Sequence, residues 1–98
     1  MVNDAVVVAP DAYKVLLEND KGRVLEDRLA PGANTEMHSH PAVVGVDLSN
    51  AKFKFTFPDG QNMKIDMEAG QAVYLYAVDH AIENTGTTEA NAILVELK

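Results

Sequence analysis

Residues 52–67, with the sequence KFKFTFPDGQNMKIDM, show the clearest alternation of apolar and polar side chains in the chain. Phenylalanine occupies every second position in the first half, as in a strand with one buried face and one solvated face. Pro58-Asp59-Gly60 then supplies turn chemistry, and methionine and isoleucine alternate with lysine and aspartate in the second half. The stretch therefore predicts a β-hairpin whose phenylalanines pack on the methionine and isoleucine side chains.

Runs of similar character lie on both sides of this hairpin. Turn residues recur about every ten positions, which is typical of an all-β sandwich or barrel. A jelly-roll barrel and an immunoglobulin-like sandwich without its disulfide and tryptophan fit this periodicity equally well. Further strands are predicted at 23–29, 42–48, 71–76 and 92–97.

The N-terminal region is predicted to be an arm with at most one short helical turn. The apolar run at 5–9 suits an edge strand that could add to the sheet of a second copy, so we expect a homodimer. Residues 11–18 fit a short helix capped by Asp11, and they fit a strand equally well because of Val15.

The composition excludes several classes of function. With no cysteine among its 98 residues, the chain has no disulfide framework, thiolate metal site or cysteine nucleophile. Its formal charge is −7 and its eight basic residues are scattered, so we expect no nucleic-acid partner. Without a charged leader or an apolar run of about 20 residues, we expect no membrane partner and a cytoplasmic protein.

The three histidines form the pattern that points to metal chemistry. His38 and His40 are one residue apart, so on a strand both imidazoles share a face at about 6–7 Å. His80 is the natural third ligand, and a three-histidine site leaves coordination positions open for water or substrate. The alternative is that the pair forms a polar loop before Pro41 and that His80 is a surface residue.

The positions of these histidines resemble the two signature motifs of the cupin superfamily. The first motif has Gly, five residues, His-x-His, three or four residues and then Glu, and Gly32, His38 and His40 match its opening. Its Glu position falls on Val44 or Gly45, so the expected fourth ligand is missing.

The second cupin motif is also matched in part. Gly70, His80 and Asn84 stand in its Gly, His and Asn positions, while Tyr76 and Val78 replace its Pro and Gly. The resemblance implies a double-stranded β-helix, or jelly roll, with the histidines inside the barrel.

The resemblance also implies an organisation for the whole chain. It predicts one cupin domain over 1–98, with an N-terminal strand or arm at 1–22 and the barrel at 23–98. The opening Val-Ala-Pro at 8–10 and the stretch LEDRLAPG at 25–32 are similar to those of very small bacterial cupins, some of them labelled beta-alanine degradation proteins.

In this interpretation His38, His40 and His80 hold one divalent transition metal, which is Zn, Fe, Ni, Mn or Cu. Water, or Glu36 from the same strand face as His38, replaces the missing glutamate. The candidates for contact with a substrate are Glu36, Tyr76 and Arg28. The alternatives are that Tyr76 covers the edge of the core and that Arg28 forms a surface pair.

Asp79 and Glu83 are candidates to orient the second ring nitrogen of His80, although strand alternation points both away from it.

The first functional hypothesis is a metal-binding cupin that binds or transforms a small polar metabolite, with dioxygenase, lyase and isomerase chemistry all open. The alternative is a homodimeric, non-catalytic ligand-binding or sensing module with no functional metal.

Overall fold

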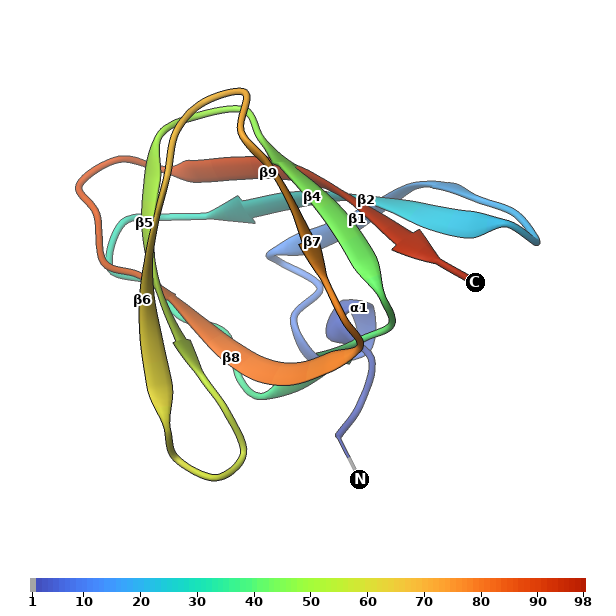
Figure 1. The fold of residues 1–98 in the computed structure, drawn as a ribbon, viewed down its shortest axis with the longest axis horizontal. Coiled ribbons are helices and arrows are strands. Elements are labelled where there is room, and N and C mark those ends of the chain that lie inside the picture. Colours follow the sequence, from blue (N-terminus) through green and yellow to red (C-terminus); the bar gives the residue numbers. More distant parts are fainter. Residues whose placement is uncertain (1) are drawn as a thin grey trace.

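The predicted hairpin is present in the computed structural model, which describes residues 2–98 (Figure 1). It consists of β5 (Ala51–Thr56) and β6 (Asn62–Met67), paired antiparallel with Phe53 opposite Ile65. The other elements, in chain order, are α1 (Ala5–Val8), β1 (Tyr13–Glu18), β2 (Gly22–Leu29), β3 (His38–His40), β4 (Val43–Asp47), β7 (Ala72–Leu75), β8 (Val78–Asn84) and β9 (Ala90–Leu97).

The strands form two antiparallel sheets that face each other around a common interior (Figure 1). One sheet has the order β1-β2-β9-β4-β7 and the other has the order β3-β8-β5-β6. Side chains from both sheets are buried between them, among them Leu25 of β2, Phe53 of β5 and Ile82 of β8. The all-β, double-stranded arrangement expected from the sequence is therefore confirmed.

The N-terminal region corrects one prediction and decides another. Residues 5–8 form the helix α1 instead of a strand, because the Asp4 side chain caps it by accepting a hydrogen bond from the Val6 amide at 3.1 Å. The segment 11–18, which fitted a helix or a strand, contributes the strand β1, which pairs along its length with β2. Sheet pairing satisfies the backbone of β1, so local propensity does not decide its conformation.

The four strands predicted from turn spacing are present, with ends that differ by one or two residues. The glycines of the two motif-like stretches, Gly32 and Gly70, have φ of +77° and +85°, a conformation that disfavours other residues. Sequence patterning did not identify β8, which carries His80. In the part of the chain that the structure describes, no helix has the length and apolar character needed to cross a membrane.

Candidate metal centre

The three histidines lie together inside the barrel. His38 and His40 project from β3, and His38 is directly opposite His80 of β8 in the antiparallel register. Their ring centroids are 4.9 to 5.3 Å apart, and all three side chains are buried. One ring nitrogen from each histidine lies within 4.8 Å of the others, close enough to hold a metal ion after small side-chain movements.

Hydrogen bonds set the tautomers of His38 and His40. His38 Nδ1 donates to the Glu36 carbonyl at 2.8 Å, and His40 Nδ1 donates to Glu96 Oε2 at 2.7 Å. A carbonyl or carboxylate oxygen only accepts, so each Nδ1 carries the proton and each Nε2 keeps its lone pair. Both rings therefore have Nε2 as the nitrogen available to a metal.

His40 is hydrogen-bonded to a series of ion pairs formed by Glu96, Arg23 and Asp4. Glu96 is 2% exposed, and its other carboxylate oxygen accepts a hydrogen bond from Arg23 Nε at 2.7 Å. Arg23 also contacts Asp4 at 2.7 Å, which raises the pKa of the guanidinium and lowers the pKa of Asp4. Arg23 thus balances the buried charge of the carboxylate that accepts the hydrogen bond from His40.

Tyr13 of β1 closes the other side of the centre. Its hydroxyl lies 3.1 Å from His38 Nε2 and donates to that nitrogen, because Nδ1 already carries the ring proton. Burial, followed by the charges of Asp27 and Glu96, raises the pKa of the Tyr13 phenol well above its usual value. The phenol therefore remains a hydrogen-bond donor, and a metal at His38 Nε2 would have to displace this hydrogen bond.

His80 differs from the other two histidines. It is 2% exposed, and neither ring nitrogen has a hydrogen-bond partner among residues 2–98. Burial, with smaller effects from His40 and His38, lowers the pKa of His80 to about 3, so the ring is neutral at neutral pH. A buried imidazole without partners costs about 1–3 kcal/mol, and a metal ion between the three rings would remove that cost. The residues present therefore fit a metal.

The three candidate substrate contacts lie elsewhere. The Glu36 side chain is exposed, and only its backbone carbonyl reaches His38. Arg28 is exposed and pairs with Glu26 at 3.5 Å, while Tyr76 is 81% exposed. The structure does not bring these three side chains together with the histidines, and a role for them in substrate binding stays a prediction.

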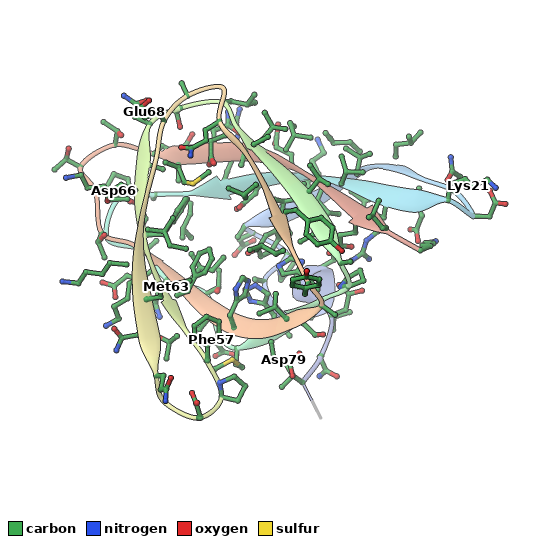
Figure 2. The ribbon with its side chains drawn as sticks, in the orientation of Figure 1. Lys21, Phe57, Met63, Asp66, Glu68 and Asp79 are labelled. Carbon is green, nitrogen blue, oxygen red and sulfur yellow. The ribbon has the colours of Figure 1, made fainter. Side chains whose placement is uncertain are left out.

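The acidic neighbours of His80 face away from it, as strand alternation predicted. Asp79 is exposed on the outer side of β8 (Figure 2). Glu83 lies 3.9 Å from Lys54 across the β5–β8 pair. Neither carboxylate hydrogen-bonds His80.

Sequence reasoning missed Tyr13 and Glu96. Glu96 had a detectable signal, because it shares strand parity with Ala90, Ala92 and Leu94 and is the acidic residue in an otherwise apolar row. Tyr13 had no comparable signal, because the segment around it fitted a helix and a strand equally well. Only the pairing of β1 with β2 places Tyr13 over the histidines.

A cavity of about 100 Å³ begins at this centre and extends between the two sheets. His40, His80 and Tyr13 line one part, and Asp27 and Asp47 line another. The rest of the wall is glycine and apolar side chains from strands β4 to β9. The wall includes Gly45, one of the two positions where the cupin motif has its glutamate.

Solved structures with the same architecture identify the fold. The chain is similar to a cupin domain from Bordetella pertussis Tohama I, at 25% identity and a TM-score of 0.80 over 88% of this chain and 91% of that one. The fold is a cupin double-stranded β-helix. No protein-family model matches the chain, and no curated protein matches its sequence.

Two more distant structures agree on the cupin fold. A protein with a double-stranded β-helix domain from Klebsiella pneumoniae is 19% identical, with a TM-score of 0.69 over 87% of this chain and 74% of that one. A cupin 2 conserved barrel domain protein from Salinispora arenicola is 18% identical, with a TM-score of 0.63 over 88% of this chain and 74% of that one. The comparisons support the cupin superfamily. None of these three structures is described as a beta-alanine degradation protein, and that finer assignment stays a prediction.

Proposed function

We propose that this cupin binds one divalent transition metal through His38, His40 and His80 and holds a small metabolite in the adjoining cavity. The observation that carries the proposal is His80, whose two buried ring nitrogens lack partners among the described residues and lie beside the Nε2 atoms of His38 and His40. An ion held by three imidazoles supplies a Lewis-acid centre with open coordination positions when it is bound.

The protein supplies orientation and exclusion of water around that centre. Glu96 and the Glu36 carbonyl hold the two β3 imidazoles in the tautomer that exposes Nε2. The wall of the cavity is mostly apolar, so a metabolite beside the centre would exchange part of its hydration for the few polar groups that line the cavity. The cavity therefore supports the small-molecule part of the proposed function.

A second candidate is a ligand-binding module that works without metal. The hydrogen bond from the Tyr13 hydroxyl to His38 Nε2 favours it, since this bond satisfies a nitrogen that a metal would need. Gly45 or Val44 in place of the motif glutamate points in the same direction. Metal analysis separates the two candidates.

The test uses full-length protein without a histidine tag, stripped with a chelator and then equilibrated separately with Zn²⁺, Fe²⁺, Mn²⁺ and Ni²⁺. We expect one ion per chain by mass spectrometry after desalting for at least one metal, and loss of that ion in His80→Ala. Asp79→Ala changes an exposed side chain on the same strand and is the matched control. Wild-type protein holding less than about 0.1 ion per chain with every metal would overturn the proposal.

We also propose that two copies associate through β1. This strand is at the edge of the five-stranded sheet, and Val15, Leu16 and Leu17 are 38 to 59% exposed on it. Such an edge with apolar side chains is favourable to cover with a second copy. Light scattering should give a dimer mass that Leu17→Lys reduces and Leu48→Lys, at another exposed leucine, does not. A monomer mass for the wild type contradicts this proposal.

A further inference from the structure

One row of side chains crosses the five-stranded sheet inside the barrel. In the antiparallel register Tyr13 of β1 pairs with Asp27 of β2, Asp27 with Ala92 of β9, and Ala92 with Asp47 of β4. All four residues line the cavity. The two carboxylates therefore flank the small side chain of Ala92, on the wall that begins with Tyr13 at the metal centre.

Neither carboxylate has a partner in the part of the chain that the structure describes. Among residues 2–98, the side chains of Asp27 and Asp47 form no hydrogen bond and no ion pair. Asp47 is only 5% exposed, Asp27 is half-buried, and both border the cavity. Carboxylates withdrawn from water are normally paired, so two free carboxylates that face one cavity indicate a missing donor.

The missing donor does not come from the basic residues of the chain. No lysine or arginine lines the cavity within the described residues, and its wall is otherwise apolar apart from the Tyr13 and histidine groups. Burial, together with the charge of Asp47, raises the pKa of Asp27 to about 7, and burial raises the pKa of Asp47. Both shifts agree with a site that lacks a positive partner.

We propose that Asp27 and Asp47 bind the ammonium group of a short primary amine whose apolar body extends along the cavity toward the three histidines. An ammonium group has three donors on one charged atom, and the two carboxylates offer four oxygen acceptors around it. The proposal rests on the proposed function for the role of the histidine end, and it names the substrate class of the same cavity.

The cavity itself selects against other ligands. A volume of about 100 Å³ is below the roughly 150 Å³ of an apolar cavity that admits benzene, so the ligand has about six non-hydrogen atoms or fewer. Anions are repelled by the two carboxylates. A second hard divalent cation would need six or more oxygen ligands, and the wall offers two carboxylates among apolar side chains.

The test is an NMR titration of ¹⁵N-labelled full chain with n-propylamine at pH 8, where the amine is charged. 1-Propanol and propionate, which have similar size, serve as comparison probes. We expect n-propylammonium to bind the wild type at least about tenfold more tightly than either probe. We also expect Asp27→Asn and Asp47→Asn each to weaken it at least about tenfold.

Two further variants complete the design. Asp66→Asn removes the same charge on β6, where Asp66 is exposed and points away from the interior (Figure 2), and should leave binding unchanged. Ala92→Val keeps both carboxylates but fills the space between them, so it should also abolish binding, even if an asparagine variant fails to fold. Binding that is no tighter than that of 1-propanol, or that survives both Ala92→Val and loss of the carboxylates, would overturn the proposal.

Running the titration on zinc-loaded and on metal-stripped protein separates this inference from the proposed function. If the chain retains zinc and does not bind n-propylammonium, the amine site is wrong and the metal site stands. If it binds n-propylammonium and retains no metal, the amine site stands and the proposed metal function is wrong.

Discussion

The histidine end and the aspartate end of the cavity differ in how their acidic side chains are paired. At the histidine end, Glu96 is matched by Arg23 and also holds His40, so the buried charge is balanced within the chain. At the aspartate end, Asp27 and Asp47 have no such partner among residues 2–98. The charge at the first end is therefore balanced without a ligand, while in our proposal the second end gains its balancing charge when a ligand binds.

Tyr13 connects the two ends. Its hydroxyl donates to His38, and its backbone pairs with Asp27 on the neighbouring strand. The charge of Asp27 contributes to the raised pKa of the phenol, so the aspartate end stabilises the protonated form of a group at the histidine end.

The largest expected effect comes from breaking the balanced end with Glu96→Gln. This change removes the charge that pairs with Arg23 and weakens the hydrogen bond to His40. We expect metal affinity to fall about 10- to 100-fold. We expect the free energy of unfolding to fall by about 2–3 kcal/mol in urea titrations. Glu89→Gln, at an exposed position, is the control. Unchanged metal affinity would show that Glu96 does not position His40.

The next effect concerns acid and the metal-free protein. The pKa values of His38 and His80 are lowered in the folded protein. Below about pH 6.5 the unfolded chain therefore binds more protons at these residues than the folded chain, and the free energy of unfolding falls as the pH is lowered. Asp27, with its pKa raised to about 7, acts in the opposite direction between about pH 4 and 7, and so does Asp47, whose pKa is also raised by burial.

Asp27→Asn should therefore reveal the histidine contribution. We expect this variant to lose about 2 kcal/mol of stability between pH 6.5 and 5, and the wild type to lose clearly less. Urea unfolding of metal-free protein across this range measures both slopes. Parallel slopes would mean that Asp27 does not titrate near neutral pH.

A smaller change in stability is expected from Asp27→Asn at pH 8. There the half-buried Asp27 carboxylate is charged and has no partner among the described residues of the ligand-free protein, so Asp27→Asn should stabilise the fold by about 1 kcal/mol. At pH 4, where Asp27 is protonated in the fold, the gain should disappear. Asp66→Asn, measured at both values of pH, controls for a general charge effect, and a variant less stable than wild type at pH 8 would contradict the unpartnered carboxylate.

The smallest effect is expected from Tyr13→Phe, which removes only a hydroxyl. Loss of the hydrogen bond to His38 Nε2 should cost about 1 kcal/mol of stability without metal. Metal affinity should rise by a few-fold, because the ion no longer displaces that bond. Tyr74→Phe at an exposed tyrosine is the control, and calorimetric metal titration gives the comparison. A fall in affinity would mean that the phenol supports metal binding.

Much of this architecture could be predicted from local pattern. Alternation at 52–67 predicted the β5–β6 hairpin, because side chains on successive strand residues point to opposite faces. The spacing in His38-Ser39-His40 predicted two imidazoles on one face for the same reason. The prediction of a strand at 5–9 was wrong, because the capping carboxylate of Asp4 favours a helical turn at 5–8.

Residue type and near neighbours are enough to predict the strand periodicity, the absence of thiol ligands and the three histidines as the candidate metal ligands. The contacts of Glu96 and Tyr13 with the histidines, and the positions of Asp27 and Asp47 on either side of Ala92, become visible only in the folded chain. These contacts join strands that are distant in the chain, and a sheet register is settled by packing between strands, which no local pattern encodes.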